Sequence, residues 1–125
     1  MAETMRGQEL ARAYLDAFVL RDYDRVRALL TDDFRLRDLS PGGFTQVDGA
    51  DEAIAGLREF LDMFESLDVL EADAYEIADV TYLRARVHFV HAEAGERFLE
   101  QHHLLRIADG RITGIDQLCT GLHVP

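Results

Sequence analysis

The sequence is poor in several features, and each scarcity excludes a class of protein. Cys119 is the only cysteine, so the chain can form no internal disulfide and no thiolate metal site. No run of about 18 apolar residues occurs, as a membrane-spanning helix would need. Residues 1–12 lack the apolar stretch of a secretory signal. We therefore expect a cytoplasmic protein with no membrane partner.

Positive charge is scarce as well. The chain has 13 basic and 24 acidic residues, which gives a formal net charge of −11. Nucleic acids and anionic membrane surfaces attract basic proteins, so this charge argues against both as partners. The remaining composition, 48% hydrophobic and 30% charged, is that of a globular protein. A chain of 125 residues without repeats or linkers predicts one domain, residues 1–125.

Apolar residues recur at helical spacing in three stretches, residues 7–20, 22–30 and 51–65. Asp22 or Asp24 is placed to cap the second helix. The apolar faces are formed by Leu10, Tyr14, Ala17 and Phe18, by Val26, Leu29 and Leu30, and by Ile54, Leu57, Leu61 and Phe64. These patterns predict three helices, of which the middle one is short.

Alternating apolar and polar residues predict the strands, and turn residues separate them. The predicted strands are residues 33–38, a short extended piece at 44–47, and then 67–78, 81–91, 97–107 and 112–122. The last four follow one another as an antiparallel meander. The sequence therefore predicts an α+β domain in which three helices pack on one curved, mainly antiparallel sheet and enclose a pocket.

The first predicted strand carries a carboxylate on its interior face. Phe34, Leu36 and Asp38 share one side of the strand, and Arg35 and Arg37 share the other. Burying a charged group without a partner is costly. Asp38 either caps the turn that follows, as Asp often does, or belongs to a functional site. The strand by itself leaves both interpretations open.

Five short segments resemble a known family. They are residues 13–18 (AYLDAF), 22–24 (DYD), 29–33 (LLTDD), 49–54 (GADEAI) and 109–112 (DGRI). They resemble sequence segments that are characteristic of nuclear transport factor 2-like domains. Within that superfamily the chain resembles most the SnoaL-like polyketide cyclases and the ketosteroid isomerase group. The resemblance implies a cone-shaped, cystatin-like fold, and it specifies the fold better than the function.

The resemblance to ketosteroid isomerase also implies roles for particular residues. That enzyme has an oxyanion-binding tyrosine on the first helix and a general-base aspartate ending the first strand, and Tyr14 and Asp38 fall in these places. Its second oxyanion donor lies on the penultimate strand, where this chain has His103, or His102 if the register slips by one. The implied catalytic residues are Asp38, Tyr14 and His103. The implied activity is cofactor-independent acid–base catalysis, as in an isomerase, a cyclase or an aldol-type enzyme.

Strand periodicity brings further polar residues to the same interior. Gln101 and His103 share a face of strand 97–107, and Gln117 lies on the corresponding face of the last strand. The predicted ligand-binding wall consists of Phe18, Phe34, Leu36, Phe60, Phe89, Gln101, Gln117 and Cys119. Convergent polar groups in an apolar cavity indicate a site for a small apolar or polyketide-like molecule. An internal hydrogen-bond network holding water is the structural alternative. A non-catalytic binding or interaction domain is the functional alternative.

The spacing of the histidines argues against a metal site. His88 and His91 are three residues apart on a strand and therefore point to opposite faces, as do His102 and His103. His91 and His103 share a face but are far apart along the hairpin. We therefore expect neither a metal nor a cofactor.

The outer face of the predicted sheet carries many apolar residues. They are Tyr82, Val90, Phe98, Leu104, Leu118 and Leu122. This is more exposed apolar surface than a monomer usually tolerates. We therefore expect a homodimer that pairs through the outer sheet face.

Overall fold

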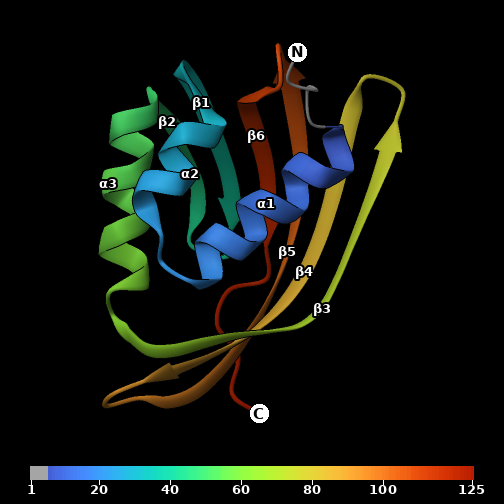
Figure 1. The fold of residues 1–125 in the computed structure, drawn as a ribbon. Coiled ribbons are helices and arrows are strands. Elements are labelled where there is room, and N and C mark those ends of the chain that lie inside the picture. The colour runs from blue at the N-terminus through green and yellow to red at the C-terminus, as the bar shows by residue number, and fades with distance from the viewer. Residues whose placement is uncertain (1–5) are drawn as a thin grey trace.

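Three helices cover one face of a six-stranded sheet in the computed structural model, which describes residues 6–125 (Figure 1). The elements in chain order are α1 (Gly7–Val19), α2 (Tyr23–Leu29), β1 (Leu30–Ser40), β2 (Gly43–Asp48), α3 (Ala50–Leu61), β3 (Phe64–Ile77), β4 (Val80–His91), β5 (Gly95–Ala108) and β6 (Arg111–Cys119). The predicted α+β class and the predicted order of elements are confirmed.

The strands lie in the order β2-β1-β6-β5-β4-β3. Strands β3 to β6 form the predicted antiparallel meander. The short extended piece after the glycines is a full strand, β2, which pairs with β1 as a hairpin. β6 closes the sheet by pairing in parallel with β1. This single parallel pair joins the first hairpin to the meander.

The sheet is strongly curved. β3 and β5 have 14 residues each, and the far ends of β3, β4 and β5 bend beneath the helices in Figure 1. Two register shifts interrupt the β3–β4 ladder, and one interrupts the β5–β6 ladder. Such irregularities bend a strand and increase its local twist. The helices therefore pack into a concave face.

The helices begin where the sequence supplies the right ends. The Asp22 side chain accepts a hydrogen bond from the Arg25 backbone N–H at 3.2 Å, so Asp22 and not Asp24 caps α2. α3 follows Gly49, whose φ of 96° favours glycine. The ends of α1 agree with the prediction to within one residue.

Several predicted boundaries were wrong, and β1 and β3 each begin three residues earlier than predicted, at Leu30 and Phe64. The third helix ends at Leu61 and not near Glu65, because Phe64 already begins β3 and is paired with His91. The Phe64 ring packs against Phe89 with centroids 4.7 Å apart, so it belongs to the sheet and not to the helix stripe. The last strand ends at Cys119, three residues earlier than predicted.

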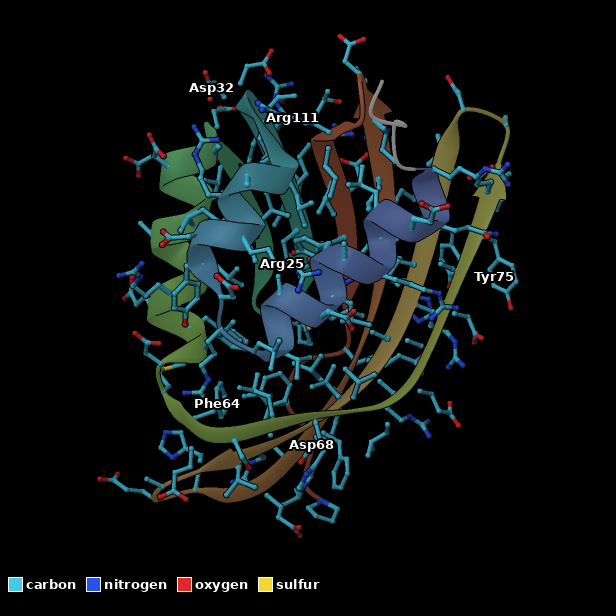
Figure 2. All side chains as sticks on the ribbon, in the orientation of Figure 1. Arg25, Asp32, Phe64, Asp68, Tyr75 and Arg111 are labelled. Carbon is cyan, nitrogen blue, oxygen red and sulfur yellow. The ribbon has the colours of Figure 1, made fainter. Side chains whose placement is uncertain are left out.

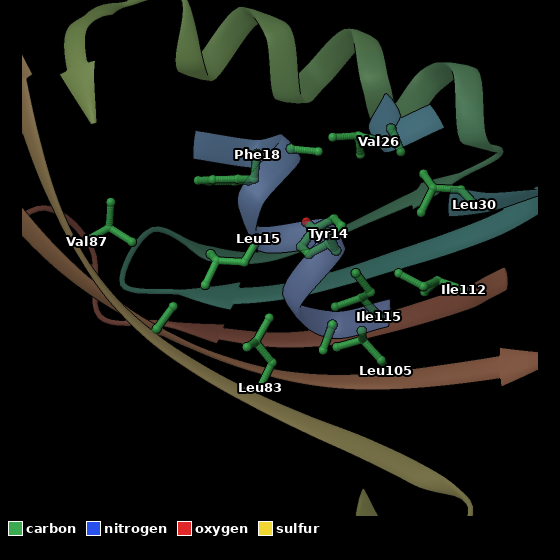
Figure 3. Packing of buried hydrophobic residues seen from close by; sticks show 14 of the residues in the cluster. Tyr14, Leu15, Phe18, Val26, Leu30, Leu83, Val87, Leu105, Ile112 and Ile115 are labelled. Atoms are coloured by element: carbon green, nitrogen blue, oxygen red, sulfur yellow. The ribbon is translucent and has the colours of Figure 1, made fainter. Parts of the chain in front are cut away.

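The two faces of the sheet differ in character. The inner face and α1 supply most of the core, which includes Leu83, Val87, Leu105 and Ile115 (Figure 3). Charged side chains project away from the core around the molecule (Figure 2). On the outer face, Arg84 forms ion pairs with Glu71, Asp73 and Glu100. No helix within residues 6–125 has the length and apolar character needed to cross a membrane.

Candidate functional site

A cavity of about 500 Å³ lies between the helices and the part of the sheet formed by β2, β1, β6 and β5. Its volume lies within the usual range for small-molecule sites. Its wall consists of Tyr14, Phe18, Val26, Leu30, Phe34, Leu36, Asp38, Ser40, Thr45, Val47, Ala53, Ile54, Gly56, Leu57, Phe60, Gln101, Gln117 and Cys119. The wall is mostly apolar, and a few polar side chains interrupt it.

Four polar residues form a row across neighbouring strands. Asp38 on β1 is paired with Thr45 on β2 and with Gln117 on β6, and Gln117 is paired in turn with His103 on β5. Residues paired in register point to the same face of a sheet. The row therefore places all four side chains on the concave side, under the helices.

Two neutral donors hold the carboxylate of Asp38. The Ser40 hydroxyl group donates to Oδ2 at 2.5 Å, and the Gln117 side-chain amide donates to Oδ1 at 2.7 Å. Both partners are side chains, and within residues 6–125 no backbone N–H donates to this carboxylate. Asp38 is half-buried and lines the cavity. These hydrogen bonds fix the orientation of the carboxylate. They differ from the bonds to backbone N–H groups by which an Asp caps a turn.

Tyr14 enters the same cavity from α1. Only 7% of the residue is exposed, and its ring lies between the helices and the sheet, with Phe18 and Val26 on one side and Ile115 on the other (Figure 3). Its hydroxyl group forms no hydrogen bond with any residue that the structure describes. Burial raises the pKa of Tyr14 to about 12, so the hydroxyl stays protonated at neutral pH and can donate. Tyr14 and Asp38 thus line one cavity as a free donor and a carboxylate acceptor.

His103, and not His102, is the inward-facing histidine. The His102 ring lies on the outer face, where it is hydrogen bonded to Tyr82 and to Glu100. His103 is 1% exposed, and its Nδ1 atom has no partner among residues 6–125. Its ring contacts the edge of the Tyr14 ring with centroids 6.1 Å apart. It does not form part of the cavity wall.

Burial also fixes the charge state of His103. Desolvation, assisted by the nearby His102, lowers the pKa of His103 from 6.5 to about 4. The ring is therefore neutral at physiological pH. A neutral, buried ring next to Tyr14 supports the phenol by packing against it.

All the predicted wall residues except Phe89 line the cavity. Phe89 is fully buried and packs against Phe60 and Phe64, with centroids 5.9 and 4.7 Å away. Sequence reasoning missed the part of the wall that β2 supplies and, apart from Phe60, the part that α3 supplies. Thr45 and Val47 were not recognised because β2 was expected only as a short extended piece. The spacing of Ile54 and Leu57 marked them as a buried helical face, but it could not show that this face borders a cavity.

Among the described residues, Asp38 is the only charged member of the wall. None of the arginines and histidines in this part of the chain lines the cavity, so the carboxylate has no cationic side chain next to it there. Within residues 6–125, no three His, Cys, Asp or Glu side chains are grouped in a way that could hold a metal ion. The arrangement provides a proton acceptor and a hydrogen-bond donor in apolar surroundings.

Comparison with known proteins identifies the family. A model of the SnoaL-like domain matches residues 11–115, which is most of the chain. The chain belongs to the SnoaL-like family. This confirms the resemblance seen in the sequence. No curated protein gives a significant match.

Several solved structures share the fold. A proposed SnoaL-like polyketide cyclase from Shewanella putrefaciens is 17% identical, with a TM-score of 0.78 over 94% of this chain and 91% of that one. An LEH-like epoxide hydrolase from M. tuberculosis is 19% identical, with a TM-score of 0.76 over 94% and 85%. A protein of ketosteroid isomerase-like fold from Catenulispora acidiphila, in complex with trimethylamine, is 18% identical, with a TM-score of 0.75 over 87% and 83%. At these identities the similarity establishes the fold alone.

The burial of His103 predicts a pH dependence of stability. The folded protein keeps His103 neutral down to about pH 4, whereas the unfolded chain protonates it near pH 6.5. Between these values the unfolded state binds more protons, so the free energy of unfolding falls as the pH falls. The slope from this residue reaches about 1.4 kcal/mol per pH unit. Urea unfolding of the His103→Leu variant from pH 7 to pH 4 should show a shallower loss than the wild type.

The control is His123→Leu, which removes an exposed histidine. Measured at the same protein concentration, it should keep the wild-type slope. Parallel curves for the wild type and His103→Leu would show that His103 is not kept neutral by burial.

Proposed function

We propose that the SnoaL-like cavity binds a small, largely apolar carbonyl compound and that Asp38 moves a proton at the carbon next to the carbonyl group. One observation carries this proposal. Within residues 6–125, the Asp38 carboxylate has no cationic partner and the Tyr14 hydroxyl group has no acceptor, and both line the same mostly apolar cavity. A base and an oxyanion donor are the two groups that proton abstraction next to a carbonyl requires.

The chemistry divides between the two residues. The Asp38 carboxylate accepts the proton, the C–H bond breaks, and its electron pair moves to the carbonyl oxygen to form an enolate. The Tyr14 hydroxyl group donates a hydrogen bond to that oxygen as its charge develops. Returning the proton to another carbon completes a double-bond shift. Attack of the enolate on a second carbonyl group gives an aldol-type ring closure.

The surroundings support this division. Ser40 and Gln117 each hold one oxygen of Asp38, which limits the orientations of the carboxylate before the ligand arrives. Apolar neighbours such as Phe34 and Leu36 lower the local dielectric, so the hydrogen bond from Tyr14 is stronger than it would be in water. His103 lies behind Tyr14 and acts through it, because it does not reach the cavity wall.

The absence of lysine limits the mechanisms by which the protein could activate the carbon next to a carbonyl group. All 13 basic residues of the chain are arginine. No side chain can therefore form a Schiff base with a carbonyl substrate, which is the alternative way to activate the neighbouring carbon. An aldol-type or isomerase reaction in this cavity has to pass through an enolate or enol.

Non-catalytic ligand binding is the second candidate. The mostly apolar wall favours it, since such a wall binds an apolar molecule whether or not a reaction follows. In that case Asp38, Tyr14 and Gln101 only orient the ligand. The two candidates differ in whether the protein accelerates proton transfer.

Proton exchange on a simple ketone tests the catalytic proposal. The bicyclic ketone 2-tetralone is apolar, is small enough for the cavity and carries acidic protons next to its carbonyl group. The wild type should accelerate exchange of these protons with D2O, followed by NMR. Tyr14→Phe should slow the exchange by about 10²–10³-fold, the usual cost of losing one oxyanion donor. Asp38→Asn, which keeps the side-chain shape, should reduce it to the buffer rate.

Binding of 2-tetralone, measured by calorimetry, separates the two candidates. Asp38→Asn should still bind the ketone, because the apolar wall is unchanged. Binding by the wild type without faster exchange would contradict the catalytic proposal and favour a binding domain.

We also propose that two copies pair through the outer sheet face. A groove of about 440 Å³ lies there, and apolar side chains from β1, β2, β5 and β6 surround it. They are Leu39, Phe44, Leu104 and Leu118, all of them exposed. The charges beside them are already paired within the chain, as in the ion pairs of Arg37 and Arg106 with Asp116. Covering this surface would therefore bury no unpaired charge.

Light scattering tests the pairing. The wild type should have the mass of a dimer at micromolar concentration. Leu118→Arg places a charge in the groove and should give a folded monomer, since residue 118 is 55% exposed and contributes little to the core. Leu20→Arg, on the helical side, is the control and should remain dimeric. A monomeric wild type would contradict the proposal.

A further inference from the structure

The described part of the cavity wall is neutral except for one charged side chain. Of the wall residues that the structure describes, only Asp38 carries a charge, and its two hydrogen-bond donors, Ser40 and Gln117, are uncharged. Elsewhere on β1 the structure pairs charges directly, as in the contacts of Arg35 with Asp48 and Arg37 with Asp116. Asp38 is thus an acidic group on the concave face with no counterion among residues 6–125.

The wall around Asp38 is rich in aromatic rings. Tyr14 and Phe18 come from α1, Phe34 from β1 and Phe60 from α3. The negative faces of aromatic rings attract cations, and the attraction grows when the cation is removed from water. A carboxylate together with aromatic rings is the combination that recognises an ammonium group attached to an apolar body. An anion would meet the negative charge of Asp38 without any cationic side chain in the described wall to offset it.

We propose that the cavity is also a receptor for apolar amines, which bind in their protonated form with the ammonium group on Asp38 and the hydrocarbon part against the aromatic wall. The ammonium group donates a charge-assisted hydrogen bond to a carboxylate oxygen of Asp38, which already accepts one hydrogen bond from a neutral side chain. Such amines would occupy Asp38 and compete with a carbonyl ligand. The inference rests on the proposed function in one respect, the use of the same cavity.

The overall charge of the chain supports this selectivity. With a net charge of −11, the protein attracts cations and repels anions as they approach. A carboxylic acid would have to place its own charge beside Asp38 in apolar surroundings, where like charges repel strongly. The cavity should therefore rank ligands of one shape by their charge.

Three compounds that share one bicyclic frame test the ranking at pH 7 by calorimetry. They are 2-aminotetralin, which is protonated, 2-tetralol, which is neutral, and tetralin-2-carboxylate, which is negative. The amine should bind at least about tenfold more tightly than the alcohol, as expected when a charge-assisted hydrogen bond replaces a neutral one. The carboxylate should bind more weakly than the alcohol.

Two variants assign the preference to one residue. Asp38→Asn keeps the shape and removes the charge, so the amine and the alcohol should bind with affinities within about threefold of each other. Asp33→Asn is the matched control, because Asp33 is an exposed residue of the same strand. This substitution changes the net charge of the protein by the same amount as Asp38→Asn. It should retain the wild-type preference for the amine.

The outcomes are distinguishable. Equal binding of the amine and the alcohol by the wild type would overturn the amine proposal and leave the carbonyl site intact. A preference for the amine that persists in Asp38→Asn would overturn it as well, since the ammonium group would then lie elsewhere. Failure of all three compounds and of 2-tetralone to bind would overturn both this inference and the proposed ligand cavity.

Discussion

The site depends on the parallel pairing of β1 with β6. This is the only parallel pair in the described sheet, and it sets Asp38 opposite Gln117 although the two are 79 residues apart in sequence. Without it, the first hairpin and the meander would be separate surfaces. With it, a polar row runs across four strands from Thr45 to His103. The side-chain amide of Gln117 then donates to the carboxylate of Asp38, which lies on the inner face near the end of β1.

The helices cover this row of polar side chains and so enclose it in a cavity. α1 brings Tyr14, and α3 supplies an apolar wall that includes Ile54 and Leu57. The resulting cavity combines a carboxylate held by two side chains, a phenol free to donate and a mostly apolar wall. This combination suits proton abstraction next to a carbonyl group, in which Asp38 takes the proton and Tyr14 binds the oxygen. It also suits an ammonium ion that contacts Asp38 while its hydrocarbon part lies against the apolar wall.

Much of this could be predicted from the sequence. Period-2 alternation placed Asp38 on the inner face with Phe34 and Leu36, and helical spacing placed Tyr14 on the buried side of α1. The same alternation put Gln101 and Gln117 in the wall. Other features depend on long-range contacts that local patterns do not encode. Nothing in the sequence around Phe64 shows that it pairs with His91, so the third helix was extended too far. The position of His103 against the Tyr14 ring, outside the cavity wall, depends on how α1 packs on β5.

We propose that one ligand contacts Asp38 and Tyr14 together, and a crystal structure of the protein with bound 2-tetralone would show whether it does. We expect the carbonyl oxygen to lie roughly 3 Å from the Tyr14 hydroxyl group and the adjacent carbon to face the Asp38 carboxylate. Water molecules bridging Asp38, Tyr14 and Gln101, with the ketone excluded from the cavity, would contradict it and identify the polar row as an internal network.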